Sequence, residues 1–259
     1  MTDLDPSRAA ADPPGAMDEF VEIFKTVFYA LLIAIVVRVL LIQPFTIPSA
    51  SMEPTLLDGD YIVVSKSAYG YSRYSIPFSP PLFVGRLLAK PPRRGDVIVF
   101  KLPRDGRTDY VKRLIGLPGD RIQMKGGLLY INNVVVPRKA LPSVLVDSGY
   151  GFTRRVERFQ ETLPGGRSYV TYDFGSDGDS DNTEVFVTPQ GHYFFMGDNR
   201  DNSLDSRAPK EIGVGYVPAE NLEGRVDRIM LSWNQGASLF KPQTWVLNLR
   251  PNRTFQAVR

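Results

Sequence analysis

Hydrophobic residues are most concentrated near the start of the chain, where the twenty residues 26–45 include one charged side chain, Arg38. As a helix, a stretch of that length measures about 30 Å, the thickness of the hydrocarbon core of a bilayer. Arg38 lies near one end, where its long side chain reaches the polar interface. Gln43-Pro44 then ends the pattern, because proline lacks a donor and disfavours helix in the preceding residue. We therefore expect a transmembrane helix over residues 20–43.

A cleaved secretory signal is the alternative to a retained anchor. The small residues 49–51 follow the apolar run, as they do at a cleavage site. However, residues 18–25 carry three acidic side chains and one lysine, whereas a signal peptide begins with basic residues. We favour an anchor, preceded by a disordered tail over residues 1–19 that we expect on the cytoplasmic side. Lysine and arginine near the span are too few to fix the orientation from charge alone.

After Pro54 the chain changes to short runs of β-type residues separated by Gly, Pro and Asp. The Gly-Gly and Asn-Asn pairs at 126–127 and 132–133 predict hairpin turns. No long helical period follows the apolar stretch, so we expect a mainly β, antiparallel fold. Residues 68–93 are rich in Tyr, Ser and Pro and predict an irregular excursion. The predicted strands are 61–65, 97–102, 110–115, 121–124, 128–131, 169–174, 185–188, 192–196 and 225–232.

Composition excludes several kinds of site. The chain has 259 residues, a net charge of +3 and no cysteine, which rules out disulfides, thiol catalysis and thiolate metal sites. Its basic residues are scattered, so we expect no nucleic-acid partner. The single histidine, His192, excludes an HExxH zinc site and leaves one candidate for a Ser-His-Asp triad. Because His192 lies among aromatic residues on a predicted strand, we expect it to pack there.

Alternating aspartates in residues 175–182 are the one hint of a metal site. Asp177, Asp179 and Asp181 resemble the start of a calcium loop, but an EF-hand also needs glycine at position six and glutamate at position twelve. Asn182 and Thr188 occupy those positions. We predict a solvated turn, and neither a metal nor another cofactor.

Two further segments hold candidate chemistry. In residues 47–55, two prolines flank Ser49 and Ser51 and favour a fixed, non-helical loop. In the predicted strand 110–115, Lys112 and Arg113 point to opposite faces, and alternation alone does not say which of them is buried. Arginine does not deprotonate in proteins, whereas the pKa of a buried lysine falls from about 10.4 toward 7–8 and suits a general base. Only Lys112 qualifies.

These segments belong to a larger pattern, which covers the chain from Phe20 to Trp233. It contains four boxes: SMEPTL at 51–56, RGDVIVF at 94–100, YVKRLIGLPGD at 110–120 and GDNRDNSLDSR at 197–207. Its order and spacing resemble the four catalytic-domain boxes of the bacterial type I signal peptidases, and their joint occurrence is very specific. The resemblance implies a serine endopeptidase in which Ser51 is the nucleophile and Lys112 the general base. It also implies an oxyanion hole formed by the Ser51 N–H and the Ser49 hydroxyl.

The resemblance also implies supporting and substrate-binding residues. Ser203 matches the serine that orients the lysine, and Asp205 and Arg207 match a supporting ion pair, while Arg94 and Asp96 are expected to be structural. Shallow apolar pockets would accept small residues such as alanine at the first and third positions before the cut. The residues at substrate-pocket positions are Phe45, Ile47, Pro48, Met52, Val99 and Val111.

The expected organisation is a catalytic β-domain over 44–120 and 190–259, split by a smaller inserted β-domain over 121–189. The expected location is the bacterial inner membrane, with a single span and the catalytic domain outside the cytoplasm. Expected partners are signal peptides of secreted preproteins and the lipid bilayer, and we expect the enzyme to act as a monomer. Trp233, Phe240 and Trp245 are candidates for the membrane interface or, equally, for the core.

Three alternatives share part of this pattern. A cytosolic Ser-Lys autoprotease of the SOS-repressor type would have the dyad but no need of the apolar stretch. A processing enzyme dedicated to one secretion or conjugation substrate would have the same fold. A non-catalytic, membrane-tethered β-domain would have lost its site, which the intact Ser51, Lys112 and Ser203 oppose.

Overall fold

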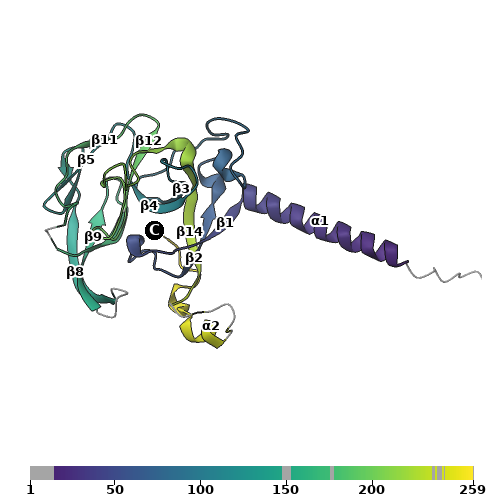
Figure 1. Ribbon diagram of the computed structural model, residues 1–259. Helices are drawn as coiled ribbons and strands as arrows, with labels where there is room; N and C mark the ends of the chain where they lie inside the picture. Colours follow the sequence, from purple (N-terminus) through teal and green to yellow (C-terminus); the bar gives the residue numbers. More distant parts are fainter. Residues whose placement is uncertain are drawn as a thin grey trace, which may run out of the picture. The chain divides into compact units, whose positions relative to one another are not determined.

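A computed structural model describes residues 15–147, 153–175, 178–234, 237, 241 and 243–258 (Figure 1). The chain divides into two compact units, Met1–Arg38 and Val39–Arg259. Helix α1 (Ala16–Leu40) contains one segment, Glu19–Arg38, that is long and apolar enough to cross a membrane, with a mean hydropathy of 2.2. Its side chains are exposed on all sides, which suits a helix surrounded by lipid.

The bounds of this helix differ from the prediction of 20–43. The helix starts at Ala16, so residues 16–19 are helical and not part of a disordered tail, while residues 1–14 lie outside the described part of the chain. It ends at Leu40 because β1 (Ile42–Thr46) follows at once and pairs with the next strand. Pro44 is tolerated there because β1 is an edge strand.

The second unit is mainly β and antiparallel, as predicted. Its largest sheet has the order β1-β2-β14-β3-β4-β12-β13, and two smaller sheets have the orders β11-β5-β6-β7 and β10-β9-β8. Short helices are α2 (Gln243–Asn248) and the 3₁₀ turns 50–52, 66–68, 73–75, 219–221 and 251–253. The remaining strands of the largest sheet are β2 (Asp60–Ser65), β3 (Val97–Lys101), β4 (Asp109–Gly116), β12 (His192–Met196), β13 (Val217–Pro218) and β14 (Leu222–Ser232). The smaller sheets contain β5 (Arg121–Lys125), β6 (Leu128–Ile131), β7 (Val134–Val135), β8 (Arg138–Asp147), β9 (Thr153–Thr162), β10 (Ser168–Asp173) and β11 (Phe186–Val187).

All nine predicted strands are present, with ends shifted by up to three residues, and both predicted hairpin turns join paired strands. Asn132 and Asn133 have φ of 54° and 65°, the left-handed conformation of a type I′ turn. The prediction missed the long strands β8 and β9. Strand β8 contains Pro142, and the β8–β9 register shifts between Leu141 and Val144, where proline does not donate to the ladder.

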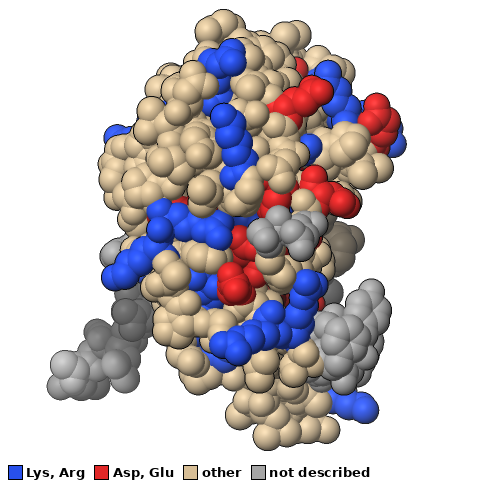
Figure 2. Space-filling view, turned by 90° about the vertical axis from the view of Figure 1, so that its left-hand side faces the viewer, with Lys and Arg blue, Asp and Glu red and all other residues tan. Residues whose placement is uncertain are grey.

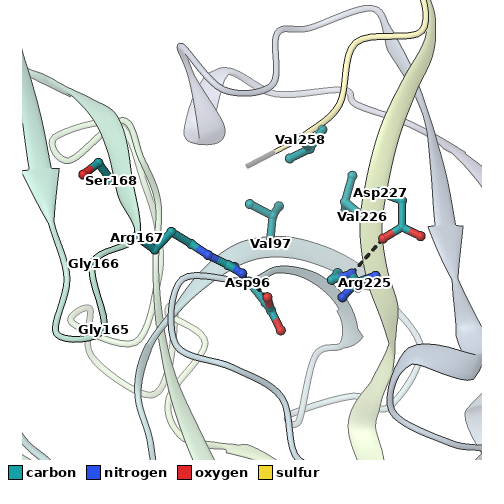
Figure 3. Close-up of a pocket in the computed structure, with 10 residues that line it drawn as sticks. All are labelled: Asp96, Val97, Gly165, Gly166, Arg167, Ser168, Arg225, Val226, Asp227 and Val258. Atoms are coloured by element: carbon teal, nitrogen blue, oxygen red, sulfur yellow. Dashed lines mark hydrogen bonds and ion pairs between the residues drawn. The ribbon is translucent and has the colours of Figure 1, made fainter.

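Residues 121–189 form the two smaller sheets, which lie together on one side of the second unit, away from β1, β2 and β14 (Figure 1). They share a hydrophobic core with the large sheet, in which Ile122 and Leu129 pack in one cluster with Ile115 and Phe194. A second tie crosses from the β9–β10 turn, where Arg167 forms an ion pair of 2.6 Å with Asp96 (Figure 3). That these residues are a separate inserted domain stays a prediction.

The tie between Arg167 and Asp96 borders a hollow of about 670 Å³ between β14, the start of β3 and the β9–β10 turn (Figure 3). Gly95 lies beside it with φ of +88°, and a Cβ atom there would approach the Arg167 side chain to 2.6 Å. This crowding explains why the segment before β3 has glycine at this position. None of the predicted catalytic residues lines this hollow.

The face of the molecule drawn in Figure 2 carries blue Lys and Arg side chains interspersed with red Asp and Glu side chains. The basic groups on this face do not merge into one continuous stripe. The expectation that the protein has no nucleic-acid partner stays a prediction.

Candidate active site

The turn that holds Ser51 is fixed on both sides. Ser51 lies in the 3₁₀ turn Ala50–Met52, five residues after β1, and Met52 is fully buried. Asn199, from the loop after β12, donates from its side chain to the Ala50 carbonyl at 3.1 Å and from its backbone N–H to the Ser51 carbonyl at 3.2 Å. The backbone that carries the Ser51 hydroxyl is therefore held both by its own turn and by a distant segment of the chain.

Lys112 lies on β4 and reaches this hydroxyl directly. Its Nζ atom is 2.6 Å from Ser51 Oγ, and the lysine is only 4% exposed. Burial lowers the pKa of Lys112 to about 8, because a charged amine loses its hydration. The charges of Asp205 and Asp198 partly oppose this shift by raising the pKa.

Arg113, the next residue, is buried as well, so the two neighbouring cations occupy opposite faces of β4 without either facing solvent. Its guanidinium forms an ion pair of 2.7 Å with Asp198, donates to the Gly95 carbonyl at 2.8 Å and lies over the Tyr169 ring. These partners satisfy a permanent charge. Arg113 therefore differs from Lys112 in having a charged partner, because no ion pair of Lys112 is seen in the described part of the chain.

The loop after β12 supplies a second buried ion pair. Asp205 is fully buried and binds Arg207 through two nitrogens at 2.9 and 2.8 Å, as the resemblance implies. Arg207 also donates to the Arg200 carbonyl at 2.6 Å. Burial by itself would raise the pKa of the Asp205 carboxyl. The charge of Arg207 and the hydrogen bonds from Arg207 and the Gly197 N–H outweigh this effect, so the pKa is lowered.

This ion pair is linked to the smaller sheets through Arg200. The Arg200 side chain binds the buried carboxylate of Glu161, on β9, through both terminal nitrogens, and Tyr169 donates to the same carboxylate at 2.7 Å. The sequence analysis gave no structural role to Arg113, Arg200, Glu161 or Tyr169. For Arg113, the available signal in the sequence was its position next to Lys112 on one predicted strand. No local sequence pattern indicated a role for Glu161.

Ser49 and Ser203 lie beside the Ser51–Lys112 pair. Ser49 Oγ is 3.3 Å from Ser51 Oγ. Ser203 Oγ is buried and has no hydrogen-bond partner among the described residues, so its predicted bond to Lys112 is not formed here. A Cβ atom on Gly197 would collide with the Ser203 side chain and the Ser51 carbonyl, which shows how closely these segments approach. Oxyanion stabilisation by Ser49 and orientation by Ser203 stay predictions.

A cleft of about 1260 Å³ opens at the dyad. One wall contains Pro48, Ser49 and Ser51, and another contains residues 108–112. Strand β4 pairs with β3 along residues 109–113, while β12 pairs with β4 only from Arg113 onward. On the side away from β3, no described strand pairs with residues 109–112, so a free strand edge lies along the cleft.

The predicted substrate-pocket residues gather near this edge but differ in access. Phe45, Ile47, Met52, Val99 and Val111 belong to one apolar cluster. Among these, Ile47, Met52 and Val99 are at most 3% exposed, whereas Phe45 and Val111 are partly exposed. Pro48 is exposed and lines the cleft. Their role in substrate binding stays a prediction.

The other residues singled out in the sequence lie away from the dyad. Asp96 is buried and pairs with the partly exposed Arg167, and Arg94 pairs with Asp120 at 2.8 Å, which fits structural roles for Arg94 and Asp96. His192 Nδ1 is 3.0 Å from the Gln190 carbonyl at the start of β12. In the described residues, no group of three metal-binding side chains occurs.

The aspartates of the polar loop and the tryptophans have the following positions. Asp181 is 2% exposed and accepts from Gly178 N–H at 2.8 Å, so the loop is less solvated than predicted, while Asp177 lies outside the described residues. Trp233 donates to the Trp245 carbonyl at 2.9 Å, and Trp245 is 41% exposed. Phe240 also lies outside the described residues.

Comparison with known proteins agrees with this geometry. The family model described as signal peptidase, peptidase S26, matches residues 20–233. Signal peptidase I of Rickettsia canadensis is 40% identical over 250 residues, covering 90% of this chain and 91% of that protein. Signal peptidase I of Rickettsia prowazekii is 40% identical over 251 residues, covering 90% and 92%.

Among solved structures, a signal peptidase I from Enterococcus faecalis is 28% identical and covers 53% of this chain and 97% of its own, with a TM-score of 0.30. At that TM-score the structural likeness adds nothing to the assignment. A serine hydroxyl bonded to a buried lysine on an antiparallel β-fold is typical of a Ser-Lys serine protease. The chain belongs to the signal peptidase family, peptidase S26, and is a serine endopeptidase of the signal peptidase I type. The family match and the similarity to signal peptidase I relatives do not favour an unrelated autoprotease or a non-catalytic domain.

Proposed function

We propose that this protein removes N-terminal signal peptides from secreted preproteins, with Ser51 as nucleophile and Lys112 as general base. The observation that carries the proposal is the 2.6 Å contact between Lys112 Nζ and Ser51 Oγ, whose residues are 4% and 8% exposed. A neutral lysine accepts the hydroxyl proton as the serine oxygen attacks, and its pKa of about 8 leaves a useful neutral fraction near pH 7.

The reaction proceeds in two steps through an acyl-enzyme. Ser51 Oγ adds to the carbonyl carbon of the scissile peptide bond while its proton passes to Lys112. The C–N bond then breaks, and protonated Lys112 returns the proton to the leaving amine of the mature protein. Water, deprotonated by neutral Lys112, attacks the ester carbonyl. The bond between this carbon and Ser51 Oγ then breaks, Ser51 Oγ takes the proton from Lys112, and the signal peptide leaves with a free carboxylate. The Ser51 N–H and the Ser49 hydroxyl would stabilise the oxyanion in both steps.

The cleft favours an extended peptide as substrate. The free edge of β4 at residues 109–112 offers backbone N–H and C=O groups, so a peptide can add as a further strand. In an added strand, alternate side chains point to the same face. Val111, which lines the cleft, and Phe45, which is partly exposed in the same apolar cluster, would then contact the first and third side chains before the cut and favour small ones such as alanine.

The apolar helix supports a membrane location. Ser51 follows the last residue of α1, Leu40, by eleven residues, which limits their separation to at most about 40 Å. A nucleophile tethered this closely remains near the surface where a membrane-threaded signal peptide presents its cleavage site. We propose a monomer with one span in the bacterial inner membrane and with the second unit outside the cytoplasm.

The test uses the full chain purified in detergent with a purified preprotein. N-terminal sequencing before and after incubation should show one new terminus at the end of the signal peptide. Ser51→Ala should leave the preprotein intact, while Ser67→Ala, which alters an exposed serine outside the cleft, should cut it normally. Normal cutting by Ser51→Ala contradicts the mechanism.

Topology is tested separately. Protease added outside spheroplasts should degrade the large unit and spare a short N-terminal fragment. Sequencing the enzyme itself decides between anchor and cleaved signal, because a mature chain that begins at or near Ser51 would rule out a retained anchor.

A further inference from the structure

The excursion between β2 and β3 has an unusual charge pattern. From residue 61 to residue 95 the chain contains six Lys and Arg residues and no Asp or Glu. Residues 74–85, in the middle, carry no charged side chain at all. The segment is therefore an uncharged stretch with basic residues on both sides. Lys66 is buried and Arg94 pairs with Asp120, whereas Lys90 and Arg93 are exposed and Arg73 is partly exposed. Exposed positive charge thus flanks the stretch, as it does in a segment that meets an anionic surface.

Residues 78–88, in which Arg86 is the one charged residue, expose large apolar side chains. Phe78 and Val84 are almost completely exposed, at 103% and 95%, and Leu88, Leu82 and Leu87 are 77%, 70% and 58% exposed. Single exposed apolar residues are ordinary on a protein surface. Five within eleven residues form a patch, and such patches mark binding surfaces.

A fixed base presents this patch. Residues Tyr71 and Leu87 are paired by two backbone hydrogen bonds of 2.9 and 2.7 Å. The Arg86 side chain is directed inward, where it donates to the carbonyls of Gly70, Ala219 and Leu222 at 2.7, 2.8 and 2.7 Å. Arg86 thereby ties the excursion to the segment that leads into β14. The exposed apolar residues lie directly before and after this fixed point of the chain.

The base of the excursion meets the end of the apolar helix. The Tyr71 hydroxyl donates to the carbonyl of Leu40, the last residue of α1, at 2.7 Å. The Lys66 N–H donates to the carbonyl of Leu41 at 3.1 Å. If α1 crosses the bilayer, these carbonyls lie where the chain leaves it, so the pair Tyr71–Leu87 starts at the membrane surface.

We propose that residues 76–88 are a membrane-contact loop that rests in the interface of a bilayer with anionic headgroups. Phe78, Val84 and Leu88 would enter the boundary between headgroups and acyl chains, while the basic residues Arg73 and Lys90 approach lipid phosphates. The inference rests on the proposed function in one respect, that α1 is the membrane anchor. A second attachment would restrict rotation of the catalytic unit about its single helix and hold the cleft at a defined angle to the bilayer.

The test takes advantage of the absence of cysteine. Full-length Phe78→Cys and Val84→Cys carry an environment-sensitive nitrobenzoxadiazole label, in vesicles of phosphatidylethanolamine and phosphatidylglycerol that contain a lipid with a nitroxide high on its acyl chain. Val134→Cys is the matched control, because Val134 is 67% exposed on β7, in a different sheet. The nitroxide should quench the labels at 78 and 84 strongly and the label at 134 weakly.

Equal quenching at all three positions overturns the proposal. So does shielding from aqueous iodide without nitroxide quenching, because that result places a protein, such as a second copy of this chain, on the patch. Replacing phosphatidylglycerol by phosphatidylcholine should reduce the quenching at 78 and 84 if anionic headgroups contribute.

An activity measurement separates this proposal from the proposed function. The double variant Phe78→Asp/Val84→Asp should cut a vesicle-inserted preprotein about tenfold more slowly than Val134→Asp, because the site loses its fixed position near the substrate. Both variants should cut a short peptide in detergent at the same rate. Unchanged cutting of the inserted preprotein refutes the membrane-contact loop, whereas failure of the proposed function would appear as full activity in Ser51→Ala.

Discussion

The protonation of Lys112 gives the sharpest test of the mechanism. Its pKa is about 8, compared with 10.5 for an ordinary lysine, and the difference corresponds to about 3 kcal/mol against charging the amine. With a pKa of about 8, roughly a tenth of the enzyme is neutral at pH 7 and nine tenths at pH 9. The value of kcat/KM should therefore rise about tenfold between these pH values and then level off. An unshifted lysine would give a rise of about a hundredfold over the same interval without a plateau.

The same shift makes a prediction about stability. Below pH 8, Lys112 is charged in both the folded and the unfolded chain, so the folded state bears the full cost of burying the charge. As the pH rises from about 8 to 10.5, the folded chain releases its proton first and that cost disappears, so Lys112 should make folding more favourable across this window. Lys112→Met should stabilise the second unit at pH 7 by up to about 3 kcal/mol and give little difference above pH 10.5.

The assay is cleavage of a short peptide by the full chain in detergent from pH 6 to pH 10, with thermal unfolding in parallel. His192→Gln should leave the rise of kcat/KM with pH unchanged, because His192 lies outside the cleft. Lys112→Arg should be inactive, since arginine does not release its proton. The reasoning is refuted if kcat/KM does not level off below pH 10. It is also refuted if His192→Gln abolishes the rise of kcat/KM with pH while Lys112→Arg still cuts the peptide.

Three further predictions concern the surroundings of the dyad. Because Ser203 Oγ has no hydrogen-bond partner among the described residues, Ser203→Ala should leave the melting temperature in thermal unfolding nearly unchanged. A fall in kcat of up to about a hundredfold in peptide cleavage is expected if the hydroxyl orients Lys112 once substrate is bound, and an unchanged kcat would contradict that role. Gly197→Ala should reduce kcat more than Ser203→Ala, because its Cβ collides with both the Ser203 side chain and the Ser51 carbonyl; equal activity to the parent chain would contradict the close approach. Glu161→Gln should destabilise the second unit by about 3–5 kcal/mol, because it leaves the buried Arg200 charge uncompensated, and Glu157→Gln at an exposed position of β9 is the control in urea unfolding.

Ser51 and Lys112, which the structure brings into contact, were selected from the sequence for different reasons. Only lysine, and not the adjacent arginine, suits a general base, and the resemblance of the four boxes assigned the serine. The pairing of Arg113 with Asp198 could not be predicted in the same way. Strand alternation sets opposite faces for Lys112 and Arg113, but it does not show that both faces are buried or which carboxylate lies opposite.

The fold class followed from short β-type runs, whereas the smaller sheets were only partly anticipated. Strand β9 is largely polar, and β8 contains Pro142, so neither has the alternation that marks a half-buried strand. Glu161 lies in that polar run and becomes important only when Arg200, 39 residues later, reaches it. Contacts of this kind depend on tertiary packing and leave no local signal in the sequence.

The position of β14 sets an order of events during synthesis. In the large sheet this strand, Leu222–Ser232, lies between β2 and β3, although it is the last of the strands to be made. The ribosome therefore completes both Ser51 and Lys112 more than one hundred residues before the strand that joins their two halves of the sheet. Long-range pairing of this kind is slow to form. A partly translated chain thus carries the reactive groups without the sheet that aligns them, and proteolytic competence arrives only after β14 has been translated.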